Sequence, residues 1–122
     1  MMAYIDKVRV DDTDYDLIED TGWVDMTVNT TNANLVSEST RPQVRRIGKV
    51  LYFRGQINTI KTGIELPLVT PPEGFVPPFS CCLIGAPQAG QIYYKSSINA
   101  FVFYNLSSNV NNARLEGVCL ID

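Results

Sequence analysis

The chain has 122 residues, of which 45% are hydrophobic and 19% are charged, with no histidine and a formal net charge of −3. This length suits one domain, and the composition excludes an intrinsically disordered chain. The acidic balance argues against a nucleic-acid-binding protein, which needs a basic surface, and no apolar run is long enough to span a bilayer. We therefore expect no nucleic-acid partner and no membrane insertion.

Residues 1–20 are expected to form an acidic element of their own, since seven of the thirteen acidic residues fall there. Two short strands joined by the turn Asp11–Asp14 are expected, because aspartates favour turns and apolar residues flank this one. The apolar positions are Ile5, Val8, Val10, Tyr15 and Leu17. A lone hairpin is marginal in water, so this one should pack on its own domain, on neighbouring subunits or on a larger particle.

Short strands separated by turn residues are expected over the rest of the chain, residues 21–122. The expected strands cover 23–28, 44–46, 50–57, 64–68, 79–84, 91–95, 98–106 and 115–121, with a loop over 29–42 and a proline-braced connection over 71–78. Gly48 and Lys49 fit a two-residue hairpin turn with glycine at the first central position. No stretch combines helical periodicity with capping residues. The pattern predicts an all-β fold, a small antiparallel β-sandwich of jelly-roll type.

Two of the expected strands, 50–57 and 98–106, are apolar on both faces. A strand in a two-layer sandwich has one buried and one solvated face, so a second apolar face needs cover. It would be either a subunit interface or binding surface, or a central strand shielded by loops. Both interpretations stay open at this point.

Several kinds of catalytic and metal chemistry are excluded by the residue types. Without histidine the chain lacks Ser-His-Asp and Cys-His catalysis and histidine-containing zinc sites. Cys81, Cys82 and Cys119 cannot close a tetrahedral zinc site alone, and adjacent cysteines point to opposite faces of a strand. Free, buried thiols are expected, in a protein made in a reducing cytoplasm. We predict no enzymatic activity, no metal and no cofactor.

The run Asp12–Asp16 begins like a calcium-binding loop. A hand-type loop needs glycine at its sixth position and a bidentate glutamate at its twelfth, where this chain has Leu17 and Trp23. The hand is therefore rejected, and whether the acidic turn binds a cation weakly stays open.

Aromatic residues gather in the expected strands 91–95 and 98–106. Tyrosine rings on a strand face can stack on sugars and offer a hydroxyl, whereas core packing is the alternative and is favoured for the phenylalanines. Trp23 is expected to anchor the core. The candidate ligand-binding residues are Tyr93, Tyr94, Asn99 and Tyr104.

Four short motifs occur in a recognisable order. They are Gly22–Trp23, the run Arg45-Arg-Ile-Gly-Lys-Val50 with Gly55, the run Pro72-Glu-Gly-Phe-Val-Pro-Pro78, and the run Leu115-Glu-Gly-Val-Cys-Leu120. This order resembles the small β-domains of bacteriophage fibres, baseplates and head fibres. Pro71 stands where that pattern usually has leucine. The opening Ile5–Val10 with Tyr15–Asp16 resembles the N-terminal attachment segments of such proteins.

The resemblance implies a homotrimeric structural protein of the virion, made in the host bacterial cytoplasm. Residues 1–20, through Ile5, Val8, Val10, Tyr15 and Leu17, would attach it to other virion proteins, and 21–122 would project outward, with Phe75 as a plug in its loop. The leading function is attachment to a host-surface saccharide, as in a tail fibre. The alternatives are a capsid decoration or head-fibre protein without a strong receptor role, and a free carbohydrate-binding module.

Overall fold

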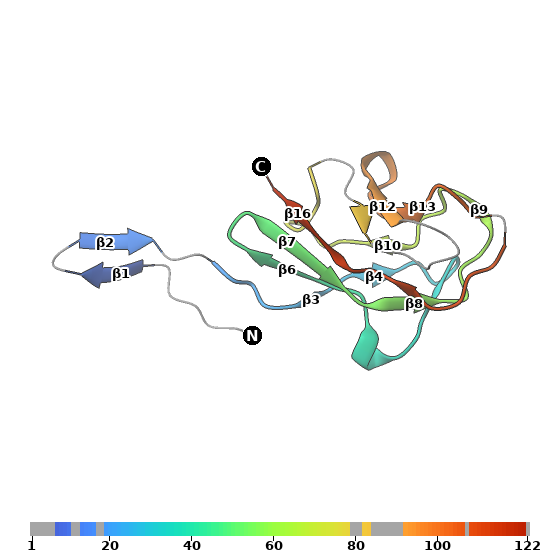
Figure 1. The fold of residues 1–122 in the computed structure, drawn as a ribbon, viewed down its shortest axis with the longest axis horizontal. Helices are drawn as coiled ribbons and strands as arrows, with labels where there is room; N and C mark the ends of the chain where they lie inside the picture. The colour runs from blue at the N-terminus through green and yellow to red at the C-terminus, as the bar shows by residue number, and fades with distance from the viewer. Residues whose placement is uncertain are drawn as a thin grey trace.

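The computed structural model describes residues 7–10, 13–16, 19–78, 82–83, 92–106 and 108–121, with side chains described from residue 19 onward except at 82–83. These residues form antiparallel strands and short 3-10 turns, and no α-helix occurs among them (Figure 1). The prediction of an all-β fold is confirmed. No helix in this part of the chain is long and apolar enough to cross a membrane.

Two larger sheets make up most of the fold. One is a five-stranded sheet in the order β11 (Cys82–Leu83), β12 (Ile92–Lys95), β13 (Ala100–Phe103), β10 (Val69–Thr70) and β4 (Thr27–Val28). The other is a four-stranded sheet in the order β16 (Gly117–Leu120), β7 (Val50–Arg54), β6 (Gln43–Ile47) and β3 (Val24–Asp25).

Two smaller sheets lie beside these larger ones. A three-stranded sheet has the order β15 (Ala113–Arg114), β8 (Gln56–Asn58) and β5 (Asn34–Leu35), and β14 (Asn105–Leu106) pairs with β9 (Gly63–Ile64). The 3-10 turns are Glu38–Thr40 and Ser96–Ile98. The first of these turns and β5 lie in the stretch 29–42, which the sequence predicts as a loop.

The hairpin turn between β6 and β7 is at Gly48 and Lys49, as predicted. Gly48 has φ +59°, the left-handed conformation that this turn position requires. The strand predicted at 50–57 is broken at Gly55, whose φ is +129°. A Cβ there would lie 2.4 Å from the Cα of Pro42, so only glycine lets the chain pass this close. The chain therefore leaves the four-stranded sheet after Arg54 and enters the three-stranded sheet as β8.

One hydrophobic core joins the sheets. Phe53 of the four-stranded sheet and Phe101 of the five-stranded sheet meet edge to face, with ring centroids 5.1 Å apart. All residues of β13 are buried. The strand predicted at 98–106 is therefore a central one, covered on both faces over this stretch. Burial of each such phenylalanine stabilises the fold by about 1.5–3 kcal/mol.

The other strand predicted to be apolar on both faces, 50–57, begins as β7, which is fully buried on one face only. In β7, Leu51 and Phe53 are buried, whereas Val50 and Tyr52 on the opposite face are only half-buried. The register places Val50 between Ile47 and Leu120, and Leu120 is 63% exposed. We call the surface formed by Ile47, Val50, Tyr52 and Leu120 the outer face.

Trp23 lies beside this surface and not in the core, so the expectation of a core anchor is wrong. The indole is half-buried, and the Arg54 guanidinium stacks over it at 4.0 Å from the ring centroid. The Arg45 guanidinium also lies over this ring, 5.9 Å from its centroid. A cation over an indole ring covers an aromatic side chain that the core does not enclose.

The predicted N-terminal hairpin is present. Strands β1 (Lys7–Val10) and β2 (Thr13–Asp16) pair antiparallel, and Figure 1 shows them apart from the larger sheets. Two of the predicted attachment residues, Ile5 and Leu17, lie outside the described residues.

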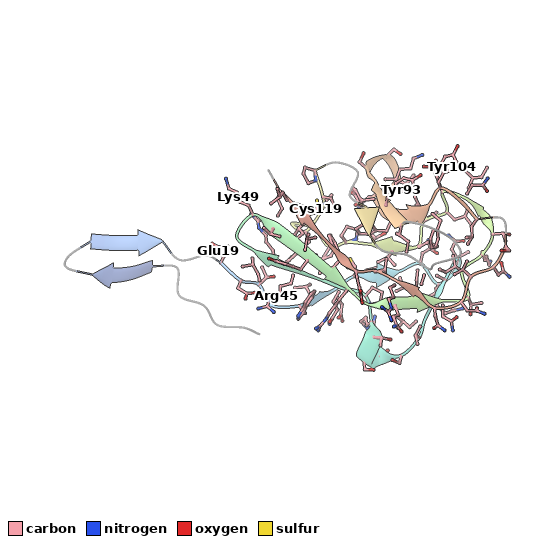
Figure 2. The ribbon with its side chains drawn as sticks, in the orientation of Figure 1. Glu19, Arg45, Lys49, Tyr93, Tyr104 and Cys119 are labelled. Atoms are coloured by element: carbon pink, nitrogen blue, oxygen red, sulfur yellow. The ribbon has the colours of Figure 1, made fainter. Side chains whose placement is uncertain are left out.

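The chain joins the four-stranded sheet immediately after this hairpin. The Glu19 carbonyl accepts a hydrogen bond from the Gly48 N–H at 2.8 Å, and Asp20 bridges to Ile47. Figure 2 shows Glu19 at the same end of the sheet as Lys49. The Asp20 carboxylate also pairs with the Arg45 guanidinium. That hydrogen bond lowers the pKa of Asp20 to about 2. The last two residues of the predicted N-terminal segment thus belong to the sheet.

Cys119 is a free, buried thiol on β16, as predicted. Cys81 lies outside the described residues, and so does the side chain of Cys82. Phe75 is half-buried and packs against the core, following Gly74 at φ +88°. This position agrees with a plug held by the proline-rich loop.

Candidate ligand-binding surface

The predicted ligand-binding residues divide between two sides of the β12–β13 hairpin. Alternation along a strand sends Tyr94 toward the core, whereas Tyr93 and Lys95 lie on the opposite face. The 3-10 turn between the strands ends at Asn99, which has φ +50°. Figure 2 shows Tyr93 and Tyr104 at the same end of the molecule.

Tyr94 is a core residue, which corrects its assignment as a ligand-binding residue. It is 2% exposed, and its ring meets Phe101 edge to face at 5.5 Å. Its hydroxyl donates to Asn99 Oδ1 at 2.6 Å, and burial raises the pKa of this phenol. The ring face is closed to a ligand, and Asn99 uses its side-chain oxygen to satisfy the buried hydroxyl.

Tyr93 belongs to a polar cluster centred on Glu65. The Tyr93 hydroxyl donates to Glu65 Oε2, and Lys95 Nζ donates to Oε1 at 2.5 Å. Glu65 has φ +49°, and its backbone N–H donates to the carbonyls of Phe103 and Tyr104, both at 3.1 Å. Two strands and a strained backbone therefore hold one carboxylate in place.

The charges in this cluster are fixed near neutral pH. Lys95, and then Tyr93, lower the pKa of Glu65 through their hydrogen bonds. Burial, and then the bond to Glu65, raise the pKa of Tyr93 to about 12. Glu65 is thus an anion and Tyr93 a neutral phenol, so the hydrogen-bonding groups are oriented before any ligand arrives.

Two large exposed side chains adjoin the cluster. Tyr104, between β13 and β14, is 68% exposed, and Ile64, on β9, is 64% exposed. Ile64 lies opposite Asn105 in the β9–β14 pairing, next to Tyr104 in sequence. We call Ile64, Glu65, Tyr93, Lys95 and Tyr104 the tyrosine surface. An exposed ring beside fixed polar groups can stack on the apolar face of a sugar while its hydroxyls are hydrogen-bonded.

The candidates predicted from the sequence include two residues of this surface, Tyr93 and Tyr104, but not Ile64, Glu65 or Lys95. Glu65 lies 28 residues before Tyr93 in the chain, in a segment predicted only as a short strand, 64–68. No local spacing connects the two, because antiparallel pairing through β14 brings them together. The alternation of Tyr93 and Lys95 along one strand was the one usable signal.

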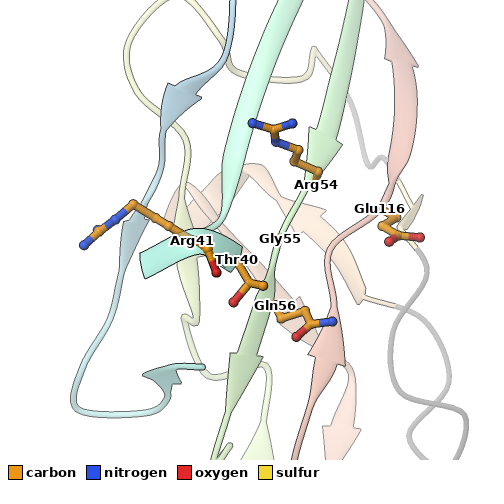
Figure 3. Close-up of a pocket in the computed structure, with 7 residues that line it drawn as sticks. Thr40, Arg41, Arg54, Gly55, Gln56 and Glu116 are labelled. Carbon is orange, nitrogen blue, oxygen red and sulfur yellow. The ribbon is translucent and has the colours of Figure 1, made fainter. Parts of the chain in front are cut away.

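A polar hollow of about 290 Å³, separate from the tyrosine surface, lies where β7 passes into β8 (Figure 3). Its lining residues are Ser39, Thr40, Arg41, Arg54, Gly55, Gln56 and Glu116. No aromatic side chain is among them. The hollow offers hydrogen bonds without a stacking platform, so it fits a sugar less well than the tyrosine surface does.

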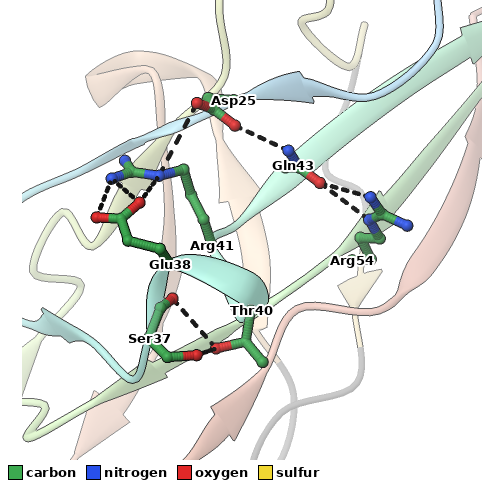
Figure 4. Close-up of polar contacts among 7 residues, drawn as sticks. All are labelled: Asp25, Ser37, Glu38, Thr40, Arg41, Gln43 and Arg54. Atoms are coloured by element: carbon green, nitrogen blue, oxygen red, sulfur yellow. Dashed lines mark hydrogen bonds and ion pairs between the residues drawn. The ribbon is translucent and has the colours of Figure 1, made fainter.

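The side chains beside this hollow are fixed by their own contacts (Figure 4). Arg41 forms a two-pronged ion pair with Glu38, with N···O distances of 2.7–3.0 Å, and this bond raises the pKa of the guanidinium. Gln43 donates to Asp25 at 2.8 Å and accepts from Arg54 at 2.7 and 3.0 Å. Arg41 is therefore already engaged by carboxylates, which leaves little of its charge for a ligand.

No group of three or more potential metal-ligating side chains gathers among the residues described. No protein-family model, curated protein or solved structure matches the chain.

Proposed function

We propose that this chain is a non-enzymatic structural protein of a bacteriophage particle and attaches the particle to a host-surface saccharide through the tyrosine surface. The observation that carries the proposal is Tyr104, an aromatic ring 68% exposed beside a preorganised Glu65–Tyr93–Lys95 cluster. Exposed rings beside fixed donors and acceptors are the elements of sugar recognition: the ring supplies apolar contact, and the polar groups define orientation.

The virion assignment is supported by the order of the motifs and by what each one does structurally. Gly48 makes the hairpin turn, Gly55 allows the close approach to Pro42, and Phe75 packs against the core after Gly74. These are the positions where the resemblance to phage β-domains requires glycine or an aromatic plug. Residues 1–20 would attach the domain to other proteins of the particle.

A jelly-roll-like sandwich and a homotrimer are further parts of this proposal. The contact between Phe53 and Phe101 across the core supports two packed layers. The outer face supports self-association, because Leu120 is 63% exposed beside the half-buried Val50 and Tyr52. Apolar and aromatic residues on one sheet face are the composition of a protein interface.

The test is saccharide binding by the purified chain. Wild-type protein should bind host cells or their wall glycans, and Tyr104→Ala should weaken binding up to about tenfold, since a ring contact is worth about 0.5–1.5 kcal/mol. Val36→Ala, another exposed apolar side chain, is the control and should bind as the wild type does. Equal binding by Tyr104→Ala, or no binding by the wild type, would contradict the proposal.

A capsid decoration or head-fibre protein is the second candidate, and the separate N-terminal hairpin favours it. In that case the chain should bind particles that lack it, and deletion of residues 1–18 should abolish binding. That deletion leaves Glu19 and Asp20, which belong to the four-stranded sheet. Particle binding together with no saccharide binding would select this candidate over the first.

A further inference from the structure

The Glu65 carboxylate is presented at the tyrosine surface from a strained backbone. Glu65 has φ +49°, a conformation that is unfavourable for a residue with a side chain and free of strain for glycine. Its side chain is 23% exposed, so the carboxylate reaches solvent. Strain of this kind is concentrated at binding and catalytic sites. The conformation therefore points to a role for this carboxylate beyond the stability of the fold.

The Glu65–Tyr93–Lys95 cluster uses only part of its hydrogen-bonding capacity. Within the described part of the chain, Glu65 accepts one bond on each carboxylate oxygen, from Tyr93 and from Lys95. Each of these oxygens has a second lone pair, and the Lys95 ammonium has further N–H donors. The Tyr93 oxygen, whose proton goes to Glu65, can also accept a bond. The cluster therefore has acceptors and donors left for a ligand.

The remaining donor and acceptor lie side by side. Lys95 Nζ is 2.5 Å from Glu65 Oε1, and the Lys95 side chain is 34% exposed. In a vicinal diol, one carbon–carbon bond holds two hydroxyl groups next to each other. One hydroxyl can donate to Glu65 while its neighbour accepts from Lys95, and both bonds are strengthened by the charge of the protein group. A single hydroxyl would satisfy only one of the two, so the pair matches two adjacent hydroxyls.

The charge of the cluster favours a neutral ligand. The Glu65 carboxylate and the Lys95 ammonium form an ion pair, so their charges compensate each other. A ligand carboxylate would be attracted by Lys95 and repelled by Glu65, and a ligand ammonium would meet the reverse. A neutral diol interacts favourably with both groups at once.

We propose that the tyrosine surface binds a neutral sugar through two adjacent hydroxyl groups, with Glu65 as the acceptor, Lys95 as the donor and Tyr104 as the stacking ring. The inference rests on the proposed function and names the class of saccharide that this surface takes. Tyr104 adjoins the diol site, because its carbonyl accepts the Glu65 N–H at 3.1 Å and its ring is 68% exposed. Tyr93 positions the carboxylate, and Figure 2 shows it at the same end of the molecule as Tyr104.

The first test is binding of the full chain to polysaccharides of defined chemistry. Mannan and dextran are neutral and carry adjacent hydroxyls, a linear β-1,3-glucan has no adjacent pair in its internal sugars, and polygalacturonate has such pairs beside a carboxylate. The wild type should bind mannan or dextran at least about tenfold more tightly than the other two. Periodate cleaves the bond between adjacent hydroxyl-bearing carbons, so the oxidised polymer, with its aldehydes reduced by borohydride, should no longer bind. Polymer treated with borohydride alone is the control.

Two variants of Glu65 test the residue assigned to the diol. Glu65→Gln replaces the charged acceptor with a neutral amide, and Glu65→Gly removes the side chain while suiting the positive φ, so the fold is kept. Both should weaken binding about tenfold or more, because a hydrogen bond to a charged group is lost. Glu116→Gln, at an exposed carboxylate lining the polar hollow, is the matched control and should bind as the wild type does. Urea unfolding of each variant checks that it folds.

Several outcomes would overturn the diol site. They are no binding to mannan or dextran, binding that survives periodate, tighter binding to the β-1,3-glucan or to polygalacturonate, and wild-type affinity in both Glu65 variants. A loss in Glu116→Gln without a loss in Glu65→Gln would also overturn it, because the diol would then lie in the polar hollow.

The proposed function is read out separately, by binding to host cells. Host-cell binding that depends on Tyr104 but not on Glu65 would reject the diol site alone. Binding to mannan or dextran as expected, with no binding to host cells, would reject the proposed function alone.

Discussion

Truncation of Tyr94 tests whether this residue belongs to the core or to a ligand site. The ring is 2% exposed and contacts Phe101, so Tyr94→Ala removes a buried aromatic side chain and leaves a cavity. Such changes cost about 3–5 kcal/mol. A domain of this size has about 5–15 kcal/mol of stability in total, so the variant should be close to unfolding.

Tyr94→Phe separates the ring from its hydroxyl. The ring and its packing remain, and only the 2.6 Å hydrogen bond to Asn99 is lost. Asn99 is exposed, so water can replace the lost partner, and the cost should be about 1 kcal/mol. The structure therefore predicts that Tyr94→Ala lowers the free energy of unfolding about three to five times as much as Tyr94→Phe does.

Urea unfolding followed by circular dichroism measures both free energies. Tyr104→Ala is the matched control, because the same change at a ring 68% exposed should alter stability by less than about 0.5 kcal/mol. A Tyr94→Ala variant within about 1 kcal/mol of the wild type would refute the core placement, since a cavity of this size cannot cost so little. Equal losses in the Ala and Phe variants would instead assign the effect to the hydroxyl.

Three further predictions follow from the backbone and the pKa shifts. Gly55→Ala should lower the free energy of unfolding by about 3–5 kcal/mol, because the new Cβ would strain the backbone and overlap Pro42. Gly74→Ala should lower it by only about 1–2 kcal/mol, because a Cβ at Gly74 meets open space. Equal urea midpoints for the two variants would contradict this prediction. The pKa of Asp20 is lowered from 3.8 to about 2, so its contribution to stability is present above pH 3.8 and lost as pH falls through 2. Asp20→Asn should abolish that part of the acid destabilisation, and an unchanged pH profile would count against the ion pair. The pKa of Tyr93 is about 12, so its contribution is complete below pH 10.0 and lost as pH rises through 12. Absorbance titration should show late phenols that include Tyr93 and the buried Tyr94. Tyr93→Phe should remove one of them, and Glu65→Gln should move one to lower pH; an unchanged number of late phenols in Tyr93→Phe would refute the assignment.

The sequence predicted the elements that are determined by a few neighbouring residues, such as turns and individual strands. Gly48 identified the β6–β7 turn, because that turn position needs a positive φ. The alternation of apolar residues identified most strands, but it could not decide which face of β12 is buried, so Tyr94 was placed on the wrong side. Glu65 joins Tyr93 only through antiparallel pairing of distant segments. Trp23 was misassigned because Arg45 of β6 and Arg54 of β7, and not the core, cover its ring.

Because of the break at Gly55, consecutive strands of one continuous segment belong to two different sheets. Val50–Arg54 pairs in the four-stranded sheet, and the same run continues as Gln56–Asn58 in the three-stranded sheet. Only Gly55 separates the two strands, and a Cβ at this position would overlap Pro42, so neither sheet can lose its strand without displacing the other. The two sheets should therefore unfold in a single cooperative step, so that residues 19–121 melt in one calorimetric transition.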